Sequence, residues 1–185
     1  MDPMGGPVLR ITLGILGVAA VATAGDALWY ELGVEHRILA GIVHGALLLA
    51  AAGAVVGLAS DRPAAGTTAG AAAGVGGAVV YYALAGWAGG RVAMGAAWGS
   101  VWLLLAIFSG RLLRSRPSPW SVILARGSQA AVLSGLAFLL VLRALWGPPP
   151  EGGRSYLVQY GAWLFAWAPG LLTLTWARRI DENGR

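Results

Sequence analysis

Residues 38–59 read ILAGIVHGALLLAAAGAVVGLA and contain no aspartate, glutamate, lysine or arginine. A helix needs about 20 predominantly apolar residues to cross the hydrocarbon core of a bilayer. This stretch is long enough, and it stops at the polar turn Ser60-Asp61-Arg62-Pro63. It therefore predicts a membrane-spanning helix.

Five further stretches on either side of it have the same apolar character. We expect these spans at residues 7–28, 68–87, 92–107, 122–146 and 156–177. Gly89-Gly90-Arg91 leaves a tight link that should join the third and fourth spans into a helical hairpin. Gly147-Pro148-Pro149-Pro150 ends the fifth span, because proline cannot continue a helix. We predict one all-α domain over residues 1–185, a polytopic membrane protein built as a bundle of six transmembrane helices.

The composition agrees with this assignment and excludes several classes of function. The chain is 57% hydrophobic and only 11% charged, whereas soluble domains are about 25% charged. Its net charge of +5 comes from scattered arginines without a basic stripe, so we expect no nucleic-acid partner. The absence of cysteine excludes a disulfide framework, a thiolate metal site and a cysteine nucleophile. No enzyme motif is present, and we predict a non-enzymatic protein without metal, cofactor or catalytic residues.

The arginines predict the orientation of the bundle, because cytoplasmic loops carry an excess of positive residues. With six spans both termini share one side, and that side holds Arg10, Arg62, Arg111, Arg114, Arg116, Arg126, Arg178, Arg179 and Arg185. The other side holds Arg37, Arg91, Arg143 and Arg154. The lack of lysine and the Ala/Gly/Arg-rich usage are typical of a GC-rich bacterial genome. We expect a bacterial inner-membrane protein with both termini in the cytoplasm.

Glycines recur at four-residue spacing in the second, third and fourth spans. The ladders are Gly41 and Gly45, Gly53 and Gly57, Gly66 with Gly70 and Gly74, and Gly95 and Gly99. Such a ladder clears one helix face and lets a second backbone approach closely, which favours helix packing. The same face would also suit a groove for a lipid or sterol, or a contact between two copies of the chain.

Few polar groups lie inside the spans. His44 is in the second span and Gln129 is in the fifth, and we interpret both as partners in interhelical hydrogen bonds. The most polar stretch lies where the first two spans meet and contains Asp26, Glu31, Glu35, His36 and Arg37. We interpret it as a solvated segment at the outer membrane face.

Aromatic residues lie on single faces of two spans. Trp98 and Trp102 are four apart in the fourth span, and Gln159, Trp163 and Trp167 follow one face of the sixth. Packing of these faces against lipid is the more common role of such aromatic residues; alternatively, each face would line an apolar pocket with one polar anchor. Pro169, just beyond, should kink the sixth helix and open a cavity. We predict a ligand-binding set made of Trp98, Trp102, Gln129, Gln159, Trp163 and Trp167.

Several short stretches resemble the Insig family of small six-span membrane proteins. Residues 54–58 read AVVGL before the acidic Asp61, residues 114–116 read RSR, and the last span runs without a gap from an aromatic-leucine start to Arg179. Gly170 and Thr173 match the family's turn in that span. The resemblance implies a six-helix bundle that binds sterols or other lipids.

Two departures from the Insig pattern argue against the family's partner retention. Leu113 stands where the family has an aspartate associated with partner binding, and Ala46-Leu47-Leu48-Leu49 replaces a stretch with paired prolines and cysteine. Lipid binding is the property that the resemblance leaves in place. Our leading hypothesis is therefore a protein that binds a membrane lipid or sterol-like ligand in an intramembrane cavity.

Two alternatives stay open from the residues. A small transporter or channel would use Arg126, Gln129 and His44 along a polar pathway. An intramembrane lipid-modifying enzyme would use His44 with Asp26 or Glu31 as an acid and base.

Overall fold

The six predicted helices are present in the computed structural model, which describes residues 5–31, 37–113, 117–145 and 155–183. They are α1 (Gly5–Glu31), α2 (Arg37–Leu58), α3 (Pro63–Ala88), α4 (Gly90–Arg111), α5 (Trp120–Leu145) and α6 (Tyr156–Asn183). Each is long and apolar enough to cross a membrane, and the described residues contain no strand. The prediction of a six-helix membrane bundle is confirmed.

Several helix boundaries differ from the prediction; the sixth helix, for example, ends at Asn183 and not near residue 177. The third helix begins at Pro63 and not near Thr68, because the fixed φ of proline suits the first helical turn, where its missing N–H is not needed. The hydroxyl groups of Thr67 and Thr68 donate to the carbonyls of Pro63 and Ala64, one turn back. The fourth helix continues past the expected end at residue 107 to Arg111.

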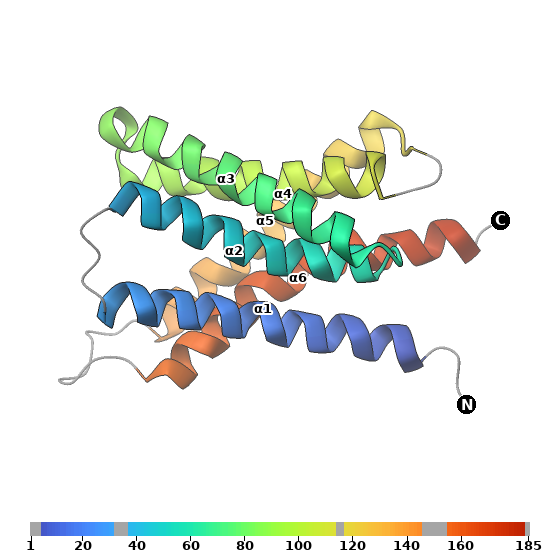
Figure 1. Cartoon of the computed structure of the whole chain (residues 1–185), viewed down its shortest axis with the longest axis horizontal. Helices are drawn as coiled ribbons and strands as arrows, with labels where there is room; N and C mark the ends of the chain where they lie inside the picture. Colours follow the sequence, from blue (N-terminus) through green and yellow to red (C-terminus); the bar gives the residue numbers. More distant parts are fainter. Residues whose placement is uncertain (1–4, 32–36, 114–116, 146–154, 184–185) are drawn as a thin grey trace.

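The helices form a closed ring in which each packs on its neighbours in the chain (Figure 1). Helix α1 also packs against α6 and closes the ring, while α2, α4 and α6 touch across the centre. Both chain ends lie at the same end of the bundle, as six spans require (Figure 1). Gly89, with a φ of 80°, makes the tight link between α3 and α4 at the opposite end.

Helices α2 and α3 are in direct backbone contact along their glycine ladders. A Cβ on Gly53 would lie 2.7 Å from the Cα of Gly70, and a Cβ on Gly57 would lie 3.0 Å from the Cα of Gly66. The packing interpretation of these glycines is thereby confirmed, since no side chain fits between the two backbones. Gly95 and Gly99 differ: a Cβ on either would meet nothing within 4 Å.

The outer surface of the bundle is apolar, as a lipid environment requires. Leu140 is 67% exposed and Leu157 is 77% exposed, which would be costly for a protein surrounded by water. Trp87, Trp120 and Trp176 are exposed near helix ends, where indole rings favour the headgroup layer. The chain is a multi-pass integral membrane protein.

Candidate functional site

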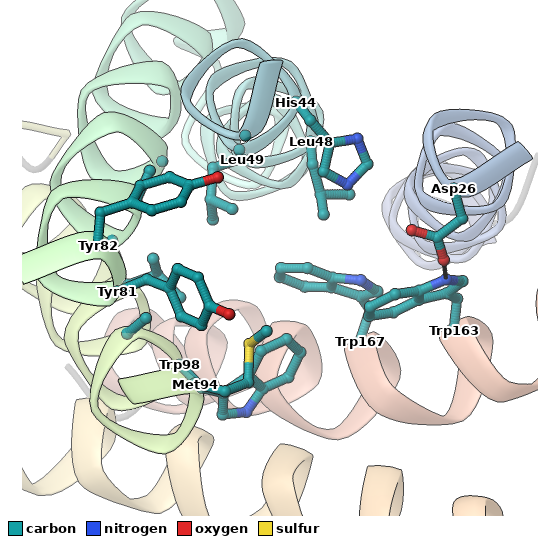
Figure 2. Close-up of a pocket in the computed structure, with 17 residues that line it drawn as sticks. Asp26, His44, Leu48, Leu49, Tyr81, Tyr82, Met94, Trp98, Trp163 and Trp167 are labelled. Carbon is teal, nitrogen blue, oxygen red and sulfur yellow. Dashed lines mark hydrogen bonds between the residues drawn. The ribbon is translucent and has the colours of Figure 1, made fainter. Parts of the chain in front are cut away.

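A cavity of about 420 Å³ lies between α1, α2, α3, α4 and α6 (Figure 2). It occupies the half of the bundle farther from the two termini, because its lining comes from the late turns of α1 and α3 and from the early turns of α2, α4 and α6. The lining is mostly apolar, with a few polar groups. Its volume falls within the roughly 300–1,000 Å³ typical of small-molecule sites.

Asp26 is the acidic side chain of the cavity. One carboxylate oxygen, Oδ2, accepts two hydrogen bonds from α6: the Gln159 amide donates at 2.8 Å, and the Trp163 indole N–H donates at 2.7 Å. The other oxygen is turned toward the space between His44 and Trp167 (Figure 2) and has no hydrogen-bond partner among the described residues. The interpretation of Asp26 as a solvated residue of a connecting segment is wrong, because α1 continues to Glu31 and α6 covers this carboxylate.

His44 of α2 lies on the same side of the cavity as Asp26 (Figure 2). Its imidazole packs on Gly25 of α1, where a Cβ would collide with the ring. The predicted interhelical hydrogen bond of His44 is not found among the described residues. The described residues also show no hydrogen bond or ion pair between His44 and Asp26. The pair therefore lacks the contact by which a carboxylate orients a catalytic histidine.

Aromatic side chains form a large part of the remaining wall, beside glycine and aliphatic residues. Trp167 is fully buried, and its ring centroid lies 5.1 Å from that of Trp98 and 5.4 Å from that of Trp102. Phe138 of α5 stacks between Trp98 and Trp163, at centroid distances of 6.0 and 5.4 Å. These five rings are one continuous cluster from α4, α5 and α6, which fixes the indoles that face the cavity.

Tyr81 and Tyr82 complete the wall from α3 (Figure 2). Their rings meet edge to face at 5.1 Å. The Tyr82 hydroxyl packs on the backbone of α2 at Gly41, where only a glycine leaves room for it. Gly41 and Gly45 of α2 and Gly74 and Gly77 of α3 also line the cavity, so the joined faces of the two helices form an apolar part of its wall.

Three buried indole N–H groups, those of Trp98, Trp102 and Trp167, have no acceptor among the described residues. A buried donor without a partner costs free energy. Trp98 and Trp167 line the cavity, so this part of the wall is apolar and offers no acceptor to their indole N–H groups among the described residues.

The predicted site residues divide into three groups. Trp98, Trp163 and Trp167 line the cavity, whereas Trp102 packs behind them and Gln159 acts through Asp26. Gln129 is exposed on α5 and does not line the cavity. Its place in the predicted set is corrected, because its face of α5 points away from α4 and α6.

Sequence reasoning missed Tyr81 and Tyr82 altogether, although adjacent tyrosines within an apolar span were a usable signal. It also failed to place Asp26 in the site. Glu35 and His36 lie outside the described residues, and of Glu31 the structure describes only the helical backbone. Within the described ranges, no group of three His, Cys, Asp or Glu side chains is arranged to hold a metal ion.

The residues of the predicted transport pathway are not brought together. His44 faces the cavity and Gln129 faces outward. Arg126 lies beside a separate small void among α4, α5 and α6, together with Ser109 and Ser118. A single polar path through these three side chains is therefore not formed in this conformation.

Comparison with protein-family models, with curated proteins and with solved structures finds no match. The relation to the Insig family accordingly stays a hypothesis that rests on the short stretches quoted above.

Proposed function

We propose that this chain is a non-catalytic membrane protein that binds one hydrophobic, lipid-like molecule with a polar head in the cavity between α1, α2, α3, α4 and α6. The observation that carries the proposal is the pairing of one oriented carboxylate with apolar and aromatic walls. That combination suits an amphiphile, because the walls take the apolar body and the carboxylate takes the head. A sterol or another membrane lipid in the manner of the Insig family falls within this class.

The position of the cavity supports a ligand that arrives from the membrane or from the outer side. It lies in the half of the bundle away from the termini. With the termini in the cytoplasm, as the arginine distribution favours, this half sits in the outer leaflet of a bacterial inner membrane.

Native mass spectrometry of the full chain after gentle extraction tests the proposal. We expect a bound lipid-sized adduct that is lost in Ala78→Phe, because Ala78 lines the cavity and the added ring occupies its volume. The matched control is Ala72→Phe, which puts the same side chain on the exposed face of the same helix. Equal retention of the adduct by both variants, or no adduct on the wild type even after incubation with membrane lipids, would contradict the proposal.

A further inference from the structure

The charge of the cavity narrows the class of ligand. Asp26 lies in the membrane-spanning part of α1, between Val8 and Leu28. A carboxylate at such a position is costly unless it is paired, and it usually marks a functional site. Among the side chains that the structure describes, no arginine lines the cavity and none forms an ion pair with Asp26.

The two hydrogen bonds on Asp26 orient the carboxylate without neutralising it. Gln159 and Trp163 are uncharged donors, and both bind the same oxygen, Oδ2. Because they hold the carboxylate from the α6 side, the second oxygen keeps a fixed direction toward the cavity (Figure 2). The site is thus built as a carboxylate that is pre-oriented toward a cationic group in the cavity.

Aromatic side chains close to Asp26 suit a cation. Trp163 and Trp167 line the cavity on the same side as Asp26 (Figure 2), and the face of an aromatic ring attracts a cation that lies within about 6 Å of its centroid. A carboxylate together with several aromatic rings is the arrangement that recognises organic ammonium groups. An anionic head would meet the Asp26 carboxylate, and no arginine stands beside it among the lining residues that the structure describes.

From these contacts we infer that the cavity binds an amphiphilic organic ammonium cation, a long-chain amine or quaternary ammonium lipid whose nitrogen sits beside the free Asp26 oxygen. The inference rests on the proposed function and narrows it from lipids in general to lipids with a cationic head. The apolar tail lies against the apolar part of the lining, which includes Leu48, Leu49 and Val101.

A head-group series on one constant tail tests the inference. Oleylamine, oleyltrimethylammonium, oleyl alcohol and oleic acid are compared by equilibrium binding to the purified full chain in maltoside micelles, whose head groups are uncharged. We expect both cations to bind at least tenfold more tightly than the alcohol, and the acid to bind most weakly. The net charge of +5 on the protein opposes any unspecific attraction of cations.

Asp26→Asn gives the matching change in the protein, because it keeps the size and removes the charge. The preference for cations over the alcohol should disappear, while binding of the alcohol itself persists. Asp61→Asn is the control, since it removes a carboxylate from an exposed turn outside the cavity, at a position with positive φ that asparagine tolerates. Tetramethylammonium is a further arm. If this soluble ion competes at concentrations similar to those of oleylamine, the tail contributes nothing to affinity. That result would contradict the inference that the ligand is an amphiphile.

The outcomes separate this inference from the proposed function. Saturable binding of all four compounds with equal affinity, or an unchanged preference for cations in Asp26→Asn, would contradict the inference of a cationic head. Either result would leave the proposed lipid binding in place. Absence of saturable binding by every oleyl compound would overturn both. The head-group series needs only the wild-type chain, so it decides the question even when Asp26→Asn does not fold.

Discussion

At the scale of single residues, Gly170 limits how the aromatic cluster is built. It lies one residue after Pro169 in α6, directly on the fully buried Trp102. A Cβ at this position would lie 2.5 Å from Cζ2 and 2.7 Å from Cζ3 of that indole. Trp102 is held in turn by Trp98 and Trp167, so the ring has no room to retreat.

Gly170→Ala should therefore destabilise the protein. Overpacking of a filled core costs about 1–3 kcal/mol, which exceeds the roughly 1 kcal/mol that alanine gains over glycine inside a helix. Thermal unfolding in detergent measures the effect as a lower melting temperature. Gly161→Ala, in the same helix, is the control because its Cβ would meet nothing within 4 Å. A melting temperature that does not separate the two variants would count against the packing of Trp102.

At the scale of helices, the apolar runs predicted all six spans, and the glycine spacing predicted close helix packing on the ladder faces that α2 and α3 turn toward each other. Both features are local and periodic, so a single sequence carries them. The site was less predictable, since Asp26 meets its partners only when α1 packs against α6, 133 and 137 residues away along the chain. From composition, a carboxylate near a span end looks the same whether it faces water or a neighbouring helix. The prediction for Gln129 was wrong for a related reason, because the sequence does not show which face of a span a single polar residue occupies.

The close contact between α2 and α3 predicts that a larger residue in the glycine ladder destabilises the protein. Gly70→Ala places a Cβ 2.8 Å from the carbonyl carbon of Leu49 and 2.9 Å from the Cα of Gly53. These are backbone atoms, which cannot move aside, so the two helices must separate. We expect a loss of stability of about 1–3 kcal/mol. Gly86→Ala, on the same helix and with nothing within 4 Å of the new Cβ, should be neutral or slightly stabilising. Thermal unfolding in detergent compares the melting temperatures of the two variants. Equal melting temperatures would contradict the close backbone contact between α2 and α3.

At the scale of the whole molecule, both chain ends lie at one end of the bundle (Figure 1). The orientation in the membrane therefore depends only on which side of the membrane this end faces. The arginine distribution predicts that this end faces the cytoplasm. The cysteine-free chain makes the test simple. Asp61→Cys and Arg91→Cys place single thiols at exposed positions at opposite ends of the bundle.

A membrane-impermeant maleimide added to intact cells should label the Arg91→Cys variant and spare the Asp61→Cys variant. Breaking the cells should make both reactive, which serves as the control for accessibility. The reverse pattern in intact cells would place the cavity in the cytoplasmic half of the membrane. A ligand would then have to arrive from the inner leaflet.

The closure of the ring by α1 and α6 also has a consequence for biogenesis. During synthesis the first helix enters the membrane long before the last one exists, and Asp26 enters with it. Until Gln159 and Trp163 are translated, that carboxylate has neither of its donors. We therefore expect chains that stop before α6 to be less stable in the membrane than completed chains, because this carboxylate then lacks both donors.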